Sequence, residues 1–190
     1  MLTHFKINLK THKEICNLFL PYLDLFLKGQ SVNLFTDNDK EILILKHFLK
    51  DEIKQYFTEY PNIKMCALGG LAPGNKLRPH IDGHNPPKPE QHWALNIPIK
   101  NCDESIMYWY DTDYEIGYAS STDDPMLIAD NLQHLVPKYA GEYKVIDSCN
   151  LDLPVFVKVT SPHSVTNHGS KPRFMLSVRF YNELTNQTAS

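Results

Sequence analysis

Hydrophobic residues follow two different periods along the chain, and the change comes near residue 60. Residues 11–60 carry apolar side chains at helical spacing, which is typical of amphipathic helices with one face toward a core. We expect helical structure over residues 11–29, either as one helix with a kink at Pro21 or as two short helices, and a further helix over residues 37–60. Residues 3–9 alternate between polar and apolar side chains and predict a short strand before the helices.

Beyond residue 60 the chain consists of short apolar runs separated by Gly, Pro, Asn and Asp. Such runs predict strands joined by turns, as in a β-sandwich or barrel. Residues 111–141 are less regular, and we expect a short helix over residues 126–135. Helices followed by strands indicate the α+β class with an all-β main body. The expected strands span residues 63–71, 77–82, 93–99, 105–110, 143–146, 155–160 and 173–180.

Length and composition fit one ordinary domain. We expect residues 1–190 to form a single unit, with a mainly helical part at 1–60, a β core at 61–181 and a tail at 182–190. The formal charge of −3 gives no electrostatic reason to expect nucleic acid or an anionic membrane as partner. No apolar run reaches membrane-spanning length, no signal peptide is evident, and the four cysteines form no C-x-x-C pair. We therefore expect a cytoplasmic protein with reduced thiols.

A histidine and a carboxylate stand two residues apart at His80 and Asp82, in a segment expected to be extended. Positions i and i+2 of a strand point to one face, so these side chains would supply two ligands of the facial triad that binds non-haem Fe(II). The pattern alone is weak, because nine His and 22 Asp plus Glu in 190 residues predict roughly one such match by chance. A second match, His12 and Glu14, lies in a helical pattern, where the two side chains do not face each other.

The last part of the chain carries further residues that iron chemistry needs. His163 follows a β-forming run, Arg173 opens another strand, and Ser177 shares the face of Arg173. Three facial ligands leave three iron positions open, of which a 2-oxo acid can take two and O2 one. If the oxo acid is 2-oxoglutarate, its distal carboxylate needs a cation, and arginine provides a bidentate one. The Ser177 hydroxyl can add a hydrogen bond.

Six short segments, spread over about residues 60–181, match one known family in order and spacing. They are Leu71-Ala-Pro-Gly, Pro79-His-Ile-Asp, Ala94-Leu-Asn-Ile-Pro-Ile, Trp109-Tyr-Asp, Pro162-His-Ser-Val, and Arg173 with Leu176-Ser-Val-Arg-Phe. In these segments the chain resembles the 2-oxoglutarate/Fe(II)-dependent oxygenase superfamily, in the branch of the aspartyl/asparaginyl β-hydroxylases and prolyl 4-hydroxylases.

That resemblance implies a fold and a set of roles. The fold would be a double-stranded β-helix, a cupin-like jelly roll, with the N-terminal helices packed against its sheet. His80, Asp82 and His163 would bind Fe(II). Arg173 would bind the distal carboxylate of 2-oxoglutarate.

Other residues remain candidates for the same roles. His84 and His168 are rivals of the two histidine ligands, and Arg179 is the rival of Arg173. Ser177 fits a co-substrate contact and simple packing equally well. Asn96 is expected beside the co-substrate. A substrate pocket is expected to include Arg78, His84, Trp93, Tyr108 and Tyr110, although strand aromatics more often pack in a core.

The function expected from this set is hydroxylation with Fe(II), 2-oxoglutarate and O2, releasing succinate and CO2. The substrate would be an amino-acid side chain, protein-bound or free, or another small molecule. Residues 83–92 and 111–141 are long enough to cover the iron and set that choice. The alternatives are another cupin-like metalloenzyme, an isomerase or hydrolase, and a non-catalytic metal-binding module.

Overall fold

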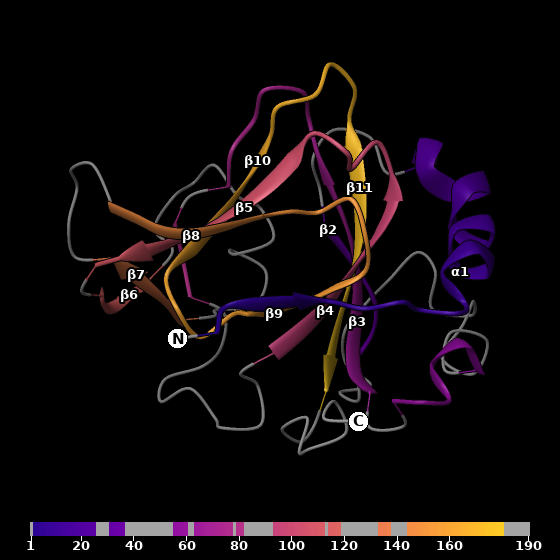
Figure 1. The fold of residues 1–190 in the computed structure, drawn as a ribbon, viewed down its shortest axis with the longest axis horizontal. Helices are drawn as coiled ribbons and strands as arrows, with labels where there is room; N and C mark the ends of the chain where they lie inside the picture. The colour runs from indigo at the N-terminus through magenta and orange to yellow at the C-terminus, as the bar shows by residue number, and fades with distance from the viewer. Residues whose placement is uncertain are drawn as a thin grey trace.

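The structure is a computed structural model, and it describes residues 2–25, 31–36, 55–60, 63–77, 79–81, 93–112, 114–118, 133–137 and 144–180. Most of this part of the chain is antiparallel β-sheet, with few helices (Figure 1). The helical elements are α1 (His12–Phe19) and two 3-10 helices, Leu20–Leu25 and Gln55–Phe57. The strands are β1 (His4–Lys6), β2 (Ser31–Thr36), β3 (Ile63–Leu71), β4 (Trp93–Lys100), β5 (Ser105–Asp111), β6 (Tyr114–Tyr118), β7 (Gln133–Pro137), β8 (Lys144–Asn150), β9 (Val155–Lys158), β10 (His163–Asn167) and β11 (Arg173–Phe180).

Two sheets of different size make up the body of the protein. The large sheet has the strand order β1-β9-β4-β11-β3-β2, and the small sheet has the order β10-β5-β8. Strands β6 and β7 form a separate two-stranded antiparallel sheet. Apolar residues of both sheets, including Val157 and Met175 of the large sheet and Met107 and Val165 of the small sheet, form one buried cluster. The sheets therefore pack face to face, with this cluster between them.

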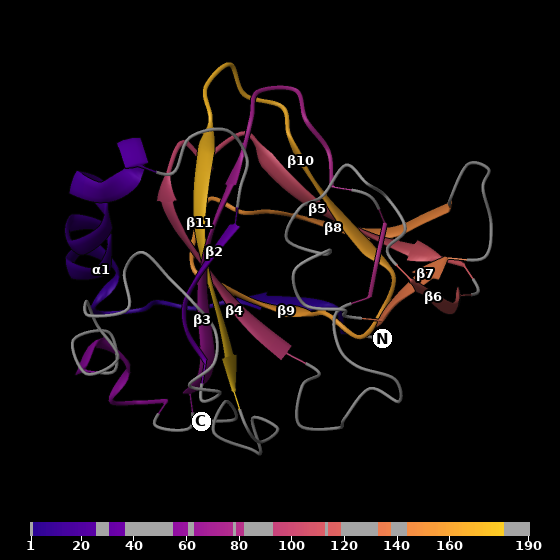
Figure 2. The same cartoon turned by 180° about the vertical axis from the view of Figure 1, so that it is seen from behind.

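The other face of the large sheet carries a second buried cluster, which includes α1. Ile15 and Phe19 of the helix join Leu176, Val178 and Phe180 of β11 there. Figures 1 and 2 show α1 on the side of the large sheet away from the small sheet. Because successive strand residues point to opposite faces, the odd-numbered residues of β11 face the space between the sheets.

Two side chains connect the sheets, one toward each end of the sandwich. At one end Trp109 of β5 is fully buried, and its Nε1–H donates to the backbone oxygen of Lys158 at 2.8 Å. At the other end Asn167 of β10 is also fully buried, and its Nδ2–H donates to the backbone oxygen of Leu71 at 3.0 Å. We call these the Trp109 end and the Asn167 end, and they define positions along the sandwich.

Most of the strands expected beyond residue 60 are confirmed. Strands β3, β4, β5, β9 and β11 agree with the predicted ranges to within two residues, because each buries apolar side chains between or behind the sheets. The described residues 76–77 and 79–81 belong to no named strand, and isolated bridges to β10 join Lys76 with Thr166 and His80 with His163. The expected strand at 77–82 is therefore present only as bridges in its described residues.

Other expectations need correction. The segment expected to be helical over residues 11–29 is α-helical only to Phe19 and then continues as a 3-10 helix that contains Pro21, whose missing N–H cannot continue the α-helical ladder. Strand β2, which was not predicted from the sequence, lies between the two ranges expected to be helical and pairs with β3. Most of the 37–60 range lies outside the described residues.

The short helix expected over residues 126–135 is wrong where it can be checked. Residues 133–137 form β7, which pairs with β6, and residues 126–132 lie outside the described part of the chain. The period of a short apolar run does not distinguish a helix from a strand. Here the segment is a strand because it pairs with β6. Within the described residues, no helix is long and apolar enough to cross a membrane.

Candidate metal centre

His80 and His163 face each other at the Trp109 end of the sandwich. Each backbone N–H donates to the other residue's carbonyl oxygen at 2.9 Å, as in an antiparallel pair. Their ring centroids are 4.4 Å apart with planes at 53°. Two side chains directly opposite in an antiparallel pair lie on the same side of the sheet. The fold therefore brings together two imidazoles that are distant in sequence.

The orientation of the His163 ring is fixed by its neighbour in the chain. Nδ1 of His163 lies 2.8 Å from the backbone oxygen of Ser161, and the side chain is buried. Because a carbonyl oxygen can only accept, Nδ1 carries the hydrogen, and the lone pair of the neutral ring lies on Nε2. A metal-binding histidine is held in this way, with the nitrogen that does not bind metal donating to a carbonyl.

The remaining predicted ligand cannot be placed. Asp82 lies outside the described residues, and so do Arg78 and His84, which were expected at the edge of the site. Among the residues that are described, no group of three or more His, Cys, Asp or Glu side chains is arranged to hold a metal ion. The triad therefore stays a prediction, with two of its three members brought together.

Arg173 is the other unusual group in the space between the sheets. It is 6 % exposed, and its Nε and Nη1 atoms have no hydrogen-bond partner. Burial lowers the pKa of this guanidinium from its usual value, although the nearby Cys102 thiol opposes the shift. Arginine nevertheless remains charged, and a buried charge is costly unless an anion compensates it. A buried guanidinium with two nitrogen atoms that lack hydrogen-bond partners makes Arg173 a candidate for binding an anion.

The strand pairings place Arg173 and the histidine pair at different positions along the space between the two sheets. His163 is the cross-strand partner of Trp109. Arg173 is the partner of Leu71, whose carbonyl accepts the Asn167 bond. From His163 to Asn167 the strand advances by roughly 13 Å. An arginine side chain leaning along its strand and a five-carbon dicarboxylate can span this separation between them.

A chain of hydrogen bonds occupies the middle of the same sheet face. The Ser177 hydroxyl donates to Oδ1 of Asn96 at 2.8 Å, and Nη1 of Arg179 donates to the Ser177 oxygen at 3.0 Å. Ser177 and Asn96 are also cross-strand partners. The one hydroxyl hydrogen of Ser177 is therefore used by Asn96 and is not available to a co-substrate in this arrangement.

The predicted pocket aromatics lie elsewhere. The Tyr110 hydroxyl is 2.6 Å from Oγ of Ser164, which follows His163 and so faces the opposite side of the small sheet. The Tyr108 hydroxyl is 3.0 Å from Nε2 of His168. Both tyrosines thus lie on the outer face of the small sheet, and His168 is held there with them, away from the histidine pair.

Trp93 is also turned away from the histidine pair. Its ring meets Phe5 edge-on, with centroids 5.4 Å apart, and packs against the α1 cluster. The aromatic residue that does lie beside the pair is Trp109, the cross-strand partner of His163. In the sequence, Trp109 was noted only as part of a motif. Because it lies between Tyr108 and Tyr110 on one strand, its side chain is expected on the opposite face from theirs.

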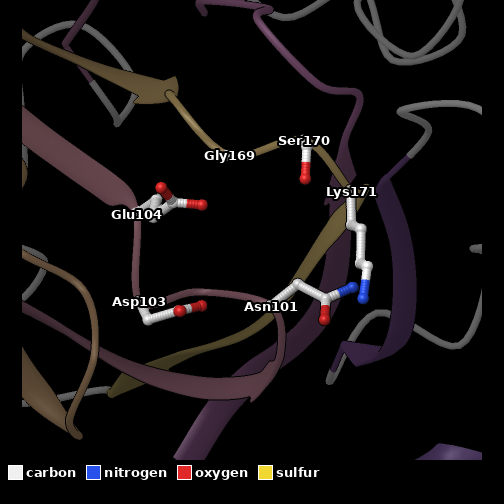
Figure 3. Close-up of a pocket in the computed structure, with 6 residues that line it drawn as sticks. All are labelled: Asn101, Asp103, Glu104, Gly169, Ser170 and Lys171. Carbon is white, nitrogen blue, oxygen red and sulfur yellow. The ribbon is translucent and has the colours of Figure 1, made fainter.

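A surface pocket lies at the other end of the molecule. It is lined by residues of two connecting loops, Asn101, Asp103, Glu104, Gly169, Ser170 and Lys171. Figure 3 shows the carboxylates of Asp103 and Glu104 across from Ser170 and Lys171. None of the predicted site residues lines this pocket, and both loops lie at the Asn167 end. It is separate from the histidine pair.

Comparison with known proteins gives only distant similarities. No protein-family profile and no curated protein matches the chain. Among solved structures, a prolyl-4-hydroxylase from Pseudomonas putida is 12% identical over 95% of this chain and 91% of its own, with a TM-score of 0.43. An oxidoreductase of the 2OG-Fe(II) oxygenase family from Burkholderia pseudomallei is 11% identical over 94% of this chain and 97% of its own, with a TM-score of 0.40. Oxalate decarboxylase from Bacillus subtilis is 18% identical over 64% of this chain, with a TM-score of 0.30, and the match spans 22% of the decarboxylase chain. These similarities do not assign the chain to a family, and the functional case rests on the residues of the site.

Proposed function

We propose that this protein is an Fe(II)- and 2-oxoglutarate-dependent oxygenase that hydroxylates a C–H bond of an organic substrate. The reaction would convert C–H, 2-oxoglutarate and O2 into C–OH, succinate and CO2, with one atom of O2 entering the substrate and the other entering succinate. The proposed substrate is an amino-acid side chain, protein-bound or free. The four cysteines are free thiols, which fits the proposed cytoplasmic location.

The observation that carries this proposal is the buried Arg173 with unpartnered Nε and Nη1 atoms. It faces the same space between the sheets as the histidine pair, because it shares a strand face with Met175. A dicarboxylate that reached from the histidines to Arg173 would give the guanidinium its missing acceptors. A metal-bound isomerase or hydrolase reaction, or a plain metal-binding module, leaves Arg173 without a ligand.

The donor set fits Fe(II). Two neutral imidazoles and one carboxylate are the facial triad of non-haem iron sites, and His80, His163 and Asp82 would supply them. When bound, Fe(II) with 2-oxoglutarate and O2 provides the oxidising power that inserts oxygen into a C–H bond. The protein's own part is to hold and orient these groups and to exclude water.

Each residue then has a defined task. The carbonyl oxygen of Ser161 orients the His163 ring through the 2.8 Å bond to Nδ1, so Nε2 would be the atom that binds the metal. Arg173 would set the depth and direction of 2-oxoglutarate by binding its distal carboxylate. Leu71, the cross-strand partner of Arg173, belongs to the buried apolar cluster between the sheets, so an ion pair formed with Arg173 would be strong.

The proposed fold is the double-stranded β-helix, with α1 bracing the outer face of its large sheet. From β3 onward, residues 76–81 and strands β4, β5, β9, β10 and β11 mostly alternate between the two sheets. This alternation supports a jelly-roll path. The outer cluster of α1 with β11 supports the bracing role.

The experiment that tests the function follows 2-oxoglutarate itself. Thermal unfolding with Mn(II), with and without 2-oxoglutarate, should show a rise in Tm that needs both, and succinate should form when Fe(II) and O2 replace Mn(II). His80→Ala should abolish both effects. His168→Ala, a histidine on the outer face of the small sheet, is the matched control and should keep them. If 2-oxoglutarate neither raises the Tm nor turns over in the wild type, the proposal is wrong.

A further inference from the structure

Cys102 is a buried thiol beside the first residues of β11. It is 4% exposed and lies in the connection from β4 to β5. Its Sγ–H donates to the backbone oxygen of Phe174 at 3.0 Å and to that of Lys100 at 3.3 Å. A thiol has one hydrogen, so the two carbonyls share it. The sulfur is therefore fixed against the main chain next to Arg173.

The strand pairings place Cys102 on one side of Arg173 and Leu71 on the other. Phe174 pairs with Lys100, the last residue of β4, so Arg173 lies one residue beyond the paired part of β4. On the β3 side, Arg173 pairs with Leu71. Cys102 and Leu71 both belong to the buried cluster between the sheets. Arg173 thus enters this space between an apolar side chain and a thiol.

The thiol and the guanidinium influence each other's ionisation. Burial lowers the pKa of Arg173, and the Cys102 thiol opposes that shift. Burial raises the pKa of Cys102, and the Arg173 charge opposes that shift. Such a mutual effect is expected of two groups that lie close together. Because the thiol hydrogen is used by the main chain, the sulfur can only accept from the guanidinium.

The guanidinium has few other contacts that could fix its direction. Its Nε and Nη1 atoms lack hydrogen-bond partners, and in the described part of the chain no carboxylate forms a salt bridge with it. A long, freely rotating side chain binds a ligand less tightly, because binding must first order it. A neighbour that already holds the guanidinium removes part of this entropic cost.

From this arrangement we propose that Cys102 is a positioning residue for 2-oxoglutarate, whose thiol holds the Arg173 guanidinium in the direction that binds the distal carboxylate. The inference rests on the proposed function and adds a residue to its co-substrate site. Cys102 acts through Arg173, so its effect on the co-substrate requires the guanidinium.

The test is calorimetric titration of 2-oxoglutarate into the Mn(II)-loaded protein and its variants. Cys102→Ala should weaken 2-oxoglutarate binding about fivefold or more with Mn(II) affinity retained, as expected for the loss of one contact of hydrogen-bond strength. Cys102→Ser keeps a donor and an acceptor at this position and should bind within about twofold of the wild type.

Two control variants separate positioning from packing. Cys149→Ala removes another buried thiol of the same cluster, so it should lose stability as Cys102→Ala does but bind 2-oxoglutarate as the wild type does. Lys100→Met changes an exposed side chain at the end of β4 and keeps the carbonyl that Cys102 contacts. It should also bind 2-oxoglutarate as the wild type does.

A double-mutant cycle tests whether Cys102 acts through Arg173. In the Arg173→Met background, Cys102→Ala should cause no further loss of 2-oxoglutarate affinity. In turnover, Cys102→Ala alone should raise KM for 2-oxoglutarate and change kcat by less than about twofold.

Three results would overturn the inference: equal affinity of Cys102→Ala and the wild type, an equal loss in Cys149→Ala, or a full additional loss in the Arg173→Met background. Each of them leaves the Mn(II)-dependent binding of 2-oxoglutarate to the wild type intact. Failure of the proposed function removes that binding in every variant, and the inference with it.

Discussion

The rings of His80 and His163 lie 4.4 Å apart, centroid to centroid, across an antiparallel bridge. Both backbone hydrogen bonds of the bridge are 2.9 Å long, so the pairing is set by the main chain. The Nδ1 atom of His163 is occupied by the carbonyl of Ser161. A metal ion between these rings would therefore meet Nε2 of His163 without a change of tautomer.

The first prediction concerns the two histidines as metal ligands. Replacing either His80 or His163 by Ala should weaken Mn(II) binding by at least about 100-fold, since removal of a ligand should cost more than the 10–100-fold seen for residues that only orient ligands. Isothermal titration calorimetry of Mn(II) measures this directly. His168→Ala should bind Mn(II) as the wild type does, and a variant His163→Ala with unchanged affinity would rule out His163 as a ligand.

The second prediction concerns stability at Arg173. Arg173→Met removes a buried charge whose Nε and Nη1 atoms lack partners and replaces it with an apolar side chain. Without ligands, the variant should be at least as stable as the wild type, by up to about 1–4 kcal/mol, because buried charges are often less favourable than apolar replacements. Urea unfolding measures the difference. A clear loss of stability in the variant would show that the guanidinium is already compensated in the free protein.

The third prediction concerns Trp109. Trp109→Phe keeps an apolar ring but removes the N–H donor to the Lys158 carbonyl and reduces the stacking of His4, whose ring centroid lies 5.4 Å away. The free energy of unfolding should fall by about 1–3 kcal/mol. Tyr108→Phe, which removes a hydroxyl on the outer face of the same strand, should change it by less than about 0.5 kcal/mol. Equal effects of the two substitutions would contradict the role of Trp109 as a connection between the sheets.

The fourth prediction concerns pH. The Thr3 hydroxyl, the backbone N–H of Ser148 and the ring of His4 hold the pKa of the Asp147 carboxyl below its usual value. A carboxyl whose pKa is lowered by folding stabilises the protein above its unfolded-state pKa, and this contribution is lost as the pH falls through the folded-state pKa.

Asp147→Asn should therefore lower the free energy of unfolding at neutral pH by no more than about 1 kcal/mol, because the carboxyl is well exposed. The difference from the wild type should be complete above about pH 5 and should shrink below about pH 4. Urea unfolding over this range measures it, with Asp103→Asn on an exposed loop as control. A difference that persists undiminished at pH 3 would contradict this explanation.

The fifth prediction concerns thiol reactivity. Burial raises the pKa of Cys149 to about 12 and also raises the pKa of Cys66, so neither forms a reactive thiolate at neutral pH. Cys16 is partly exposed and should be alkylated first by iodoacetamide in the folded protein. Peptide mapping by mass spectrometry gives the order, and the urea-unfolded protein, in which all four should react, is the control. Early labelling of Cys66 would mean that the large sheet opens.

Much of the β core was predictable because the alternation of side chains along each strand indicates which residues are buried. The residues of β11 alternate between the α1 cluster, through Leu176 and Val178, and the space between the sheets, through Met175. The same alternation correctly placed Arg173 and Ser177 on one face. Strand β10 was missed because Ser164 and Thr166 face outward on a strand of only five residues, which gives too little apolar pattern to read.

The site was predictable as residue types but not as contacts. His80 and His163 meet through a bridge between segments far apart in the chain, and no local pattern encodes that pairing. Nor could the sequence show that Ser177 gives its only hydrogen to Asn96, since this depends on the register of β4 against β11. Side chains alternate between the two faces of β5, so Tyr108 and Tyr110 lie on the outer face once Trp109 is known to be buried between the sheets. The alternation alone does not show which face is the inner one.

The central claim is that 2-oxoglutarate binds between a metal ion held by the histidine pair and the guanidinium of Arg173. The most direct measurement is calorimetric titration of 2-oxoglutarate into the Mn(II)-loaded protein, its Arg173→Met variant and the Lys100→Met control. We predict saturable binding that requires Mn(II), a loss of affinity of about tenfold or more in Arg173→Met with Mn(II) affinity retained, and unchanged binding in Lys100→Met. Equal 2-oxoglutarate affinity in Arg173→Met and the wild type, or binding that does not depend on the metal, would contradict it.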